Sequence, residues 1–378
     1  MTFSTLALVL ALGLAGPLLS WRMSWHIPII VGELLAGVLL GTTGFGVLHP
    51  GDPTLTFLAD MGFALVMFVA GTHVPVRDPA VRSALAVGAL RAVLVGLCAA
   101  AAGFTLADWF GTGHGAIYAV LIASSSAALA LPLIDAQGLQ GQSALELTAQ
   151  VALADTACIV GLPLVIDIAD AGRAMLGALA VAAAAAVLFF ALRQLERSGL
   201  RRRAHEVSEN RKFALELRVS LILLFALAAL AADTHVSIML AGFATGLAVA
   251  GVGEPRRVAR QLFAITEGFF SPLFFVWLGA QLNLREFAER PRLILLGLGL
   301  GLAAVLAHML MRLLGQPITY GALAAAQIGV PVAAVTVGTQ LHVLVRGEAA
   351  ALMLGALVTI AGAAIASALA ARAAQRPH

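Results

Sequence analysis

Long apolar runs separated by short polar stretches repeat along the whole chain. A helix that crosses a bilayer needs about 20 mostly apolar residues, and windows of this kind occur thirteen times. We therefore expect an all-α polytopic membrane protein with about 13 transmembrane helices. The windows cover about 3–20, 26–46, 57–73, 81–103, 115–135, 144–168, 174–194, 216–232, 237–252, 261–282, 293–314, 318–342 and 348–371.

Composition excludes a soluble domain. The chain has 378 residues, of which 61% are hydrophobic and 11% charged, and its mean hydropathy is +0.97. Soluble domains carry about 25% charged residues. The chain contains no metalloprotease HExxH, nucleophile elbow, phosphate-binding glycine loop or CxxC motif, so we expect a transporter and not an enzyme, with no cofactor and no nucleic-acid partner.

The basic residues between the windows are distributed unevenly. With 13 spans, the two termini lie on opposite sides of the membrane. Seventeen of the 23 lysines and arginines then fall on the side of the C-terminus and five on the other, while Arg91 lies inside a span. Basic loops stay in the cytoplasm, so this bias predicts a cytoplasmic C-terminus and an N-terminus outside.

Two pairs of segments resemble each other at nearly one offset. HIPIIVGELLAGVLLG matches HVSIMLAGFATGLAVAG, which aligns Gly37 with Gly246, and MFVAGTHVPVRD matches FVWLGAQLNLRE, which aligns Gly71 with Gly279. The offset corresponds to seven spans, an odd number, and this predicts an inverted-topology repeat. The predicted divisions are a first repeat with a connecting seventh span (1–196), a basic cytoplasmic linker (197–215) and a second repeat (216–378).

Two of the windows contain residues that interrupt a helix. The window 115–135 has Ser124, Ser125 and Ser126 about ten residues in, and 318–342 has Gly329 and Pro331 about eleven residues in. At 1.5 Å per residue, both positions are roughly 15 Å deep. Glycine and proline free backbone groups there, and serine hydroxyls can bond them. We therefore expect two discontinuous helices that cross at mid-membrane; the alternative is a pair of kinked packing helices.

Asp155 lies at the same depth, eleven residues into the window 144–168. A carboxylate there costs at least ~2.5 kcal/mol, so a functional role is the default interpretation. Burial disfavours the charged carboxylate, whereas a bound cation stabilises it, so Asp155 can hold a proton or a cation but not both. The hydroxyls of Ser124–Ser126 are hard oxygen ligands suited to an alkali cation. This combination predicts cation–proton exchange.

Three further charged residues lie within or beside the spans. Glu33 and Arg91 have similar depths from the cytoplasmic side, and we expect them to form a structural ion pair; a direct role in the ion path is the alternative. Asp60 begins its span, so we expect an interfacial or helix N-terminal carboxylate, with a second cation ligand as the alternative.

Neutral polar residues accompany the interrupted spans. Gln150 and Gln327 lie on the helices of Asp155 and of Gly329, and we expect them to form hydrogen bonds between helices, or else to line the ion site. His308 lies within the eleventh span. We expect a histidine whose hydrogen bonds are satisfied, and the alternative is a pH sensor.

Five motifs resemble those of a known family, in the same order and spacing. The chain is similar to the bacterial monovalent cation–proton antiporters of the second cation–proton antiporter family, in particular the Kef-type branch. This resemblance covers nearly the whole chain and implies the sodium–proton antiporter fold, a homodimer, the bacterial inner membrane and the role of transport aspartate for Asp155. The motifs are IPIIVGELLAGVLLG (27–41), LADMGFALVMFVAG (58–71), SSSAALALPLIDAQG (124–138), VALADTACIVGLPLV (151–165) and FFSPLFFVWLGAQLNL (269–284).

The chain departs from these relatives at three places. Ala154 stands where a second polar or acidic residue often precedes the transport aspartate, the eleventh span has no lysine near Ala303, and Ile328–Val330 replaces a common Arg-Gly-Glu. The resemblance then implies electroneutral exchange of Na⁺ or K⁺ for H⁺, by alternating access around Asp155. The alternatives are a gated K⁺ efflux path on the same fold and a proton-coupled transporter of an organic solute.

Overall fold

The computed structural model describes residues 1–21, 29–72, 79–136, 139–166, 171–199, 215–234, 236–253 and 256–374. Within these ranges the regular secondary structure is helical, without a strand. Ten of the described helices are long and apolar enough to cross a membrane, and two shorter ones, Ile29–Leu40 and Ile238–Val252, are also apolar. The expected all-α polytopic class is confirmed, while the count of thirteen spans stays a prediction.

The chain divides into two compact units, and each takes segments from both halves of the sequence. The units therefore do not follow the predicted repeat boundaries, which describe sequence similarity and not compactness. The predicted linker 197–215 lies almost wholly outside the described residues. The first unit comprises Met1–Asp52, Asp78–Ile168 and Phe275–His378, and the second comprises Pro53–Arg77 and Ala169–Phe274.

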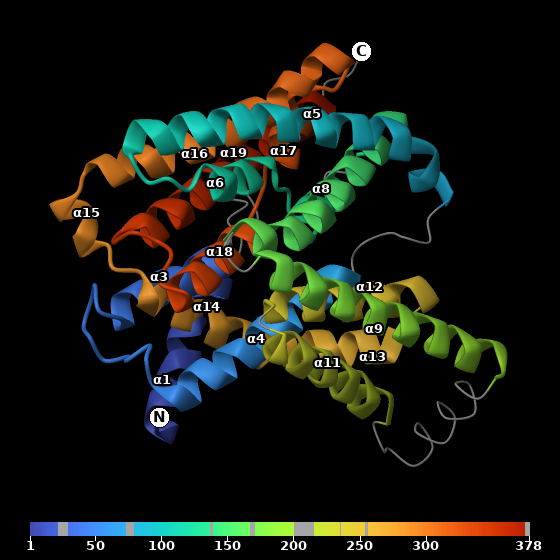
Figure 1. Ribbon diagram of the computed structural model, residues 1–378, viewed down its shortest axis with the longest axis horizontal. Helices are drawn as coiled ribbons and strands as arrows, with labels where there is room; N and C mark the ends of the chain where they lie inside the picture. The colour runs from blue at the N-terminus through green and yellow to red at the C-terminus, as the bar shows by residue number, and fades with distance from the viewer. Residues whose placement is uncertain are drawn as a thin grey trace. The chain divides into compact units, whose positions relative to one another are not determined.

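In the first unit, long helices pack against the shorter, interrupted ones. The helix α5 (Pro79–Phe110) lies along α6 (Gly115–Ala123) and α8 (Gln142–Ile166), and α16 (Arg292–Met309) lies along α19 (Glu348–Ala374) (Figure 1). The other elements of this unit are α1 (Phe3–Gly13), α2 (Ala15–Ser20), α3 (Ile29–Leu40), α7 (Ala127–Ala136), α15 (Arg285–Glu289), the 3₁₀ turn η3 (Leu310–Leu314), α17 (Ile318–Ala324) and α18 (Gly329–Gln340).

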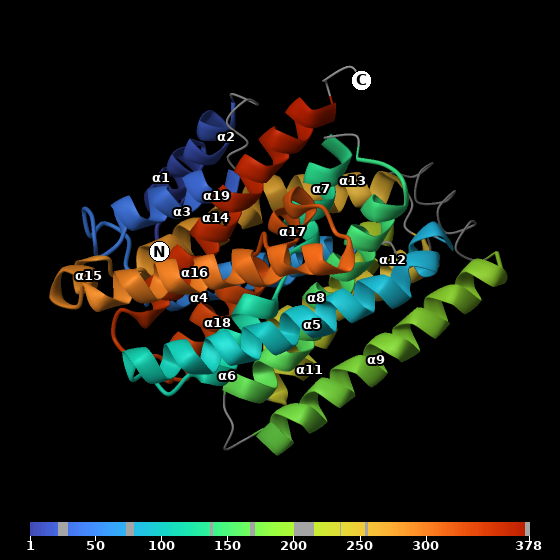
Figure 2. The same ribbon diagram turned by 90° about the horizontal axis from the view of Figure 1, so that it is seen from above.

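In the second unit, α4 packs against α12, and α12 packs in turn against α9 and α11. Figure 2 shows the long helix α9 along its full length. The elements of this unit are α4 (Pro53–Thr72), α9 (Ala171–Arg197), α11 (Leu215–Asp233), α12 (Ile238–Val252), α13 (Arg256–Ile265) and the π-helical turn η2 (Thr266–Phe270). The chain passes to the first unit within α14 (Ser271–Gln281). The outer side of α9 is apolar and exposed, with Leu176 and Val187 at 69% exposure, as expected for a surface that contacts lipid.

Glycines bring α3 and α14 together in the first unit. A Cβ atom added to Gly37 would lie 2.1 Å from the carbonyl oxygen of Val276, and one added to Gly279 would lie 2.2 Å from the carbonyl oxygen of Leu34. Any larger residue would push the two backbones apart, so these positions require glycine.

The second unit contains the same contact between α4 and α12. A Cβ atom at Gly246 would lie 2.1 Å from the carbonyl oxygen of Phe68, and one at Gly71 would lie 2.3 Å from that of Phe243. Each of the four positions corresponds to one of the first unit, through the two offsets that relate the sequence repeats. Equivalent segments thus make equivalent contacts, which is the behaviour that an inverted repeat predicts.

Candidate functional site

Two helices of the first unit are interrupted at the positions that the sequence marked. Ser124–Ser126 forms an extended link between α6 and α7, and Ala325–Ile328 links α17 to α18. Pro331 is the third residue of α18. It lies in the first turn, where a missing N–H removes no hydrogen bond within the helix. Proline is therefore compatible with the start of α18, the second half of this interrupted helix.

The two interruptions meet each other. The backbone N–H of Ser126 donates to the carbonyl oxygen of Ala326 over 2.8 Å. The hydroxyl of Ser124 bonds the side-chain oxygen of Gln327 and the carbonyl oxygen of Leu121. Every residue from 321 to 336 is buried, so protein and not lipid surrounds this crossing, as unpaired backbone groups at membrane depth require.

Asp155 lies at the beginning of α7, beside the crossing. Its Oδ2 accepts a hydrogen bond of 2.9 Å from the backbone N–H of Ala127, the first residue of that helix. Asp155 is 3% exposed. The partial positive charge of a helix N-terminus favours a carboxylate here. Among the described residues this is the single hydrogen bond of the carboxylate, which has about four acceptor positions when ionised.

His308 contacts the first interruption. The ring is fully buried in α16, with Nδ1 2.9 Å from the carbonyl oxygen of Ala304 and Nε2 3.4 Å from the hydroxyl of Ser125. Gly321 allows α17 to pack closely on the backbone of α16 at this point, because a Cβ there would lie 2.7 Å from the His308 carbonyl oxygen. The histidine has hydrogen-bond partners, as expected, but the sequence did not predict that one of them belongs to the interrupted helix.

The chemistry of the crossing suits a hard, monovalent cation. It offers one carboxylate, serine hydroxyls and backbone carbonyl groups, all of which are oxygen ligands. Within the described part of the chain, no group of three or more His, Cys, Asp and Glu side chains could hold a metal ion. A transition-metal centre of that composition is therefore absent from these residues.

Arg91 pairs with Glu146, and the predicted ion pair with Glu33 is wrong. The Arg91 guanidinium is 2.9 Å from the Glu146 carboxylate and 3.2 Å from the carbonyl oxygen of Leu314. The prediction was based on the similar depths of Glu33 and Arg91 from the cytoplasmic side. Similar depth does not determine which helices are in contact. Helix α5 lies along α8, which brings Glu146 to Arg91, whereas Glu33 is buried in α3 near Gly16 of α2.

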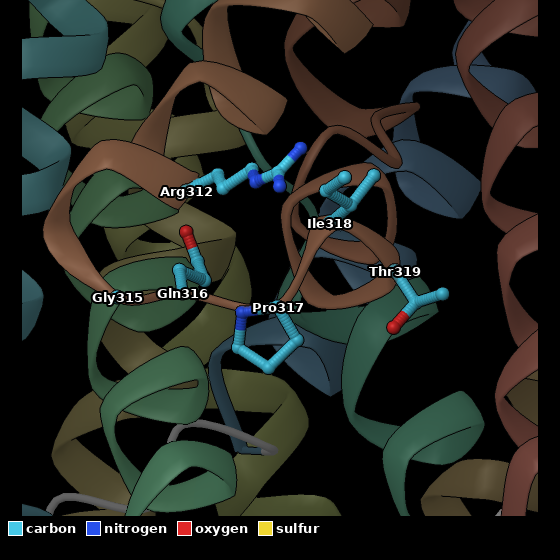
Figure 3. Close-up of a pocket in the computed structure, with 6 residues that line it drawn as sticks. All are labelled: Arg312, Gly315, Gln316, Pro317, Ile318 and Thr319. Atoms are coloured by element: carbon cyan, nitrogen blue, oxygen red, sulfur yellow. The ribbon is translucent and has the colours of Figure 1, made fainter.

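Gln150 of α8 forms a hydrogen bond to a turn, whereas the favoured expectation was a bond between helices. Its Oε1 accepts from Nε2 of Gln316 over 2.9 Å. Gln316 also lines a pocket of about 430 Å³ at the turn between η3 and α17, shown in Figure 3. The pocket is lined by Arg312, Gly315, Gln316, Pro317, Ile318 and Thr319. None of the predicted cation ligands belongs to this lining, so the pocket is not the site around Asp155.

Asp60 is not at the start of its helix. Helix α4 begins at Pro53, so Asp60 is its eighth residue, beyond the first turn that a helix N-terminus influences. Proline favours the first position of a helix because its φ is already helical, and this extends α4 ahead of the apolar window. Asp60 belongs to the second unit and Asp155 to the first.

Nothing in the sequence marked Glu348 as a buried carboxylate. Glu348, at the start of α19, is fully buried and accepts hydrogen bonds from Tyr118 Oη at 2.6 Å and Val345 N at 2.8 Å. His114 Nδ1 lies 2.8 Å from the same carboxylate. An acidic residue in a first helical turn is ordinary, and its side-chain partners are more than 200 residues away, so no local pattern could have identified it.

Comparison with known proteins gives the family. The model of the family described as sodium/hydrogen exchanger, transmembrane, matches residues 5–375. The chain belongs to this family. It is 24% identical over 381 residues to the "Putative Na(+)/H(+) antiporter YjbQ" of Bacillus subtilis, covering 94% of this chain and 61% of that protein. It is 27% identical over 302 residues to the Na(+)/H(+) antiporter NhaS5 of Synechocystis, covering 75% of this chain and 41% of that protein.

A solved structure supports the fold independently. The sodium proton antiporter MjNhaP1 of Methanocaldococcus jannaschii matches with a TM-score of 0.67 over 98% of this chain and 97% of the other, at 17% identity. The expected antiporter fold is thereby confirmed. The chain spans 61% and 41% of the length of the two curated relatives, and its assignment to the Kef-type branch stays a prediction.

Proposed function

We propose that this chain exchanges a monovalent cation, Na⁺ or K⁺, for H⁺ across a membrane, with Asp155 holding each in turn. One observation carries the proposal: the Asp155 carboxylate is buried at the meeting point of two interrupted helices and receives one hydrogen bond from the described part of the chain. Membership of the exchanger family and relatives named Na(+)/H(+) antiporters support it.

The physical basis is competition for one charge. Burying an ionised Asp155 without a counter-ion costs free energy. The carboxylate therefore changes its access from one side of the membrane to the other only with a proton or a cation bound. The hydroxyls of Ser124–Ser126 and the carbonyl ends of the interrupted helices are the proposed cation ligands. Gln327 and Gly329 support this arrangement, Gln327 through its bond to Ser124 and Gly329 as the first residue of α18. Alternating access around Asp155 would then make exchange obligatory.

The decisive test compares two Asp→Asn variants in proteoliposomes with a pH-sensitive dye inside. Asp155→Asn keeps the size of the side chain and an oxygen for the Ala127 N–H, but it cannot carry a proton against a cation. We expect its Na⁺- or K⁺-driven proton flux to fall to the level of empty vesicles. Asp108→Asn changes an exposed carboxylate of α5 and should exchange normally. Wild-type flux in Asp155→Asn would reject the proposal.

A single carrier carboxylate further suggests electroneutral exchange. One proton leaves for each monovalent cation that binds, so the rate should not respond to an imposed membrane potential. The same vesicles distinguish the channel alternative, because a cation channel passes current without a proton gradient and an exchanger does not. Steady cation current in the absence of a proton gradient would favour the channel.

The proposed setting is the inner membrane of a bacterium, with the C-terminus in the cytoplasm and the N-terminus outside, in a homodimer. The excess of basic loop residues on the C-terminal side supports the orientation. Protease digestion of a C-terminal tag in inside-out and right-side-out vesicles tests it, since cleavage should occur in the inside-out vesicles. Light scattering of the purified protein measures whether the particle has the mass of two chains.

A further inference from the structure

The pocket between η3 and α17 contains a buried polar atom that lacks a hydrogen-bond partner. Gln316 lines this pocket and is 2% exposed. Its Nε2 donates to Oε1 of Gln150 over 2.9 Å, but its Oε1 receives no hydrogen bond from the described residues. A buried acceptor without a donor costs free energy. An occupant of the pocket that supplies an O–H or N–H group would remove this cost.

A positive charge lies at the same pocket. Arg312 is exposed and belongs to the lining, and within the described part of the chain it forms no ion pair. Figure 3 shows the Gln316 oxygen pointing toward the side chain of Arg312. A guanidinium presents its donors in a planar fork that fits two oxygens of an anionic group such as phosphate. The pocket therefore combines a group that binds anions with an acceptor for a hydroxyl.

The pocket has room for a small polar group. Its volume is about 430 Å³, within the range of about 300–1,000 Å³ that is usual for sites of small molecules. The hydroxyl-bearing side chain of Thr319 also belongs to the lining. A phosphate with a short hydroxylated substituent matches both the size and the polar groups of this pocket.

The surface beside the pocket is apolar. Leu310 and Leu313 of η3 and Ile318 of α17 are exposed, Leu313 by 80%. In a membrane protein, such side chains contact acyl chains. A ligand that satisfies Arg312 and also covers these side chains needs an anionic head and an apolar tail. Arg312 further belongs to the side that the basic loops predict to be cytoplasmic, and the cytoplasmic leaflet carries anionic lipids.

We propose that this pocket binds the headgroup of an anionic phospholipid of the glycerol type. The phosphate pairs with Arg312, a headgroup hydroxyl donates to Oε1 of Gln316, and the acyl chains cover the exposed leucines of η3. A choline headgroup fits neither polar contact, because it has no hydroxyl and its lipid has no net charge.

The turn that forms the pocket is attached to two long helices. Gln316 bonds Gln150 of α8, and the carbonyl oxygen of Leu314 accepts from Arg91 of α5. Helix α8 is also the helix that carries Asp155. A lipid bound to Gln316 should therefore stabilise the packing of this turn on α8, and with it the folded protein.

The test measures the melting temperature of the purified full chain in detergent during titration with short-chain lipids. Dihexanoyl phosphatidylglycerol should raise the melting temperature to a plateau, because a ligand of the folded state stabilises it. Dihexanoyl phosphatidylcholine should give no such rise. Dihexanoyl phosphatidylmethanol has the same charge but no hydroxyl, so it should bind about fivefold more weakly. Glycerol 3-phosphate, which lacks acyl chains, should bind more weakly still.

Two arginine variants locate the site. Arg312→Gln should lower the affinity for phosphatidylglycerol on the order of tenfold, since a charged hydrogen-bonding partner is lost. Arg292→Gln is the matched control, because Arg292 is an exposed arginine at the start of α16 and lies outside the lining. Both side chains are exposed, so without lipid both variants should melt as wild type does.

Unchanged affinity in Arg312→Gln, or an equal plateau with phosphatidylcholine, would overturn the inference. Equal affinities for phosphatidylglycerol and phosphatidylmethanol would contradict the contact with Gln316. If glycerol 3-phosphate bound as tightly as the lipid, the pocket would be a site for soluble phosphate esters and not for a lipid. None of these outcomes depends on ion exchange, so the pocket is tested separately from the proposed function.

Discussion

Two buried carboxylates of the first unit have opposite surroundings. Asp155 is 3% exposed and Glu348 fully buried, yet Asp155 receives one hydrogen bond within the described residues, from Ala127. Glu348 is contacted by Tyr118 Oη, Val345 N and His114 Nδ1, all within 3.0 Å. The two carboxylates are almost equally buried, so they differ in the number of hydrogen-bond donors that the protein supplies to each.

This difference separates a structural carboxylate from one that can exchange its ligands. A buried carboxylate with a full set of donors is stabilised in one state and resists any change of partner. One with a single donor depends on something additional, a proton or a cation, to complete its surroundings. The comparison therefore favours a structural role for Glu348, between α6 and the start of α19, and it supports the exchange proposed for Asp155.

The largest expected effect is on stability, in Glu348→Gln. The amide nitrogen places hydrogens where the carboxylate accepted them, so at least one of Tyr118 and Val345 loses its acceptor. We expect a loss of about 3 kcal/mol, measured as a fall of the melting temperature in detergent. Exchange per folded molecule should remain within about twofold of wild type, because Glu348 has no hydrogen bond to the crossing.

Glu289→Gln is the matched control, since Glu289 is exposed and its substitution should leave the melting temperature unchanged. A folded Glu348→Gln protein with normal stability and no exchange would reverse the comparison. Glu348 would then have to be counted among the carriers of the proton.

The sequence identified Asp155 and missed Glu348 for a physical reason. A carboxylate in the middle of an apolar window is costly wherever its neighbours lie, so its depth alone marks it. An acid at the start of a window has no such cost until the rest of the protein covers it. Tyr118 of α6 and His114, the residue before that helix, cover Glu348 in this way. No residue spacing along the chain predicts that contact.

The helix interruptions and the ion pair of Arg91 show the same limit of prediction from sequence. Ser124–Ser126 and Gly329 mark breaks because the local residue types disfavour a continuous helix, and the structure has its interruptions there. The partner of Arg91 depends instead on which face of α5 meets α8, and the neighbour of His308 on the approach of α16 to the crossing. Those contacts depend on helix rotation and packing, which depth and residue type do not determine.

A smaller effect, with the opposite sign, is expected for Asp155→Asn. The amide oxygen still accepts from Ala127, and no charge has to be buried, so we expect about 1 kcal/mol of added stability in alkaline buffer free of Na⁺ and K⁺, where the wild-type carboxylate has lost its proton. Adding Na⁺ should raise the melting temperature of the wild type, because a ligand that binds the folded state stabilises it. The variant should show no such rise. A cation-dependent rise in Asp155→Asn equal to that of wild type would place the cation elsewhere.

An effect of similar size and opposite sign tests how the stabilisation at Glu348 is divided among its donors. Tyr118→Phe removes one hydroxyl, and with it the hydrogen bond of 2.6 Å, while the ring keeps its packing. A hydrogen bond to a charged acceptor contributes about 1.5–3 kcal/mol, and the remaining donors can compensate in part. We therefore expect a loss of about 1 kcal/mol, smaller than in Glu348→Gln, with unchanged exchange. If both substitutions cost the same stability, Tyr118 alone holds the carboxylate, and the bonds from Val345 and His114 contribute nothing measurable.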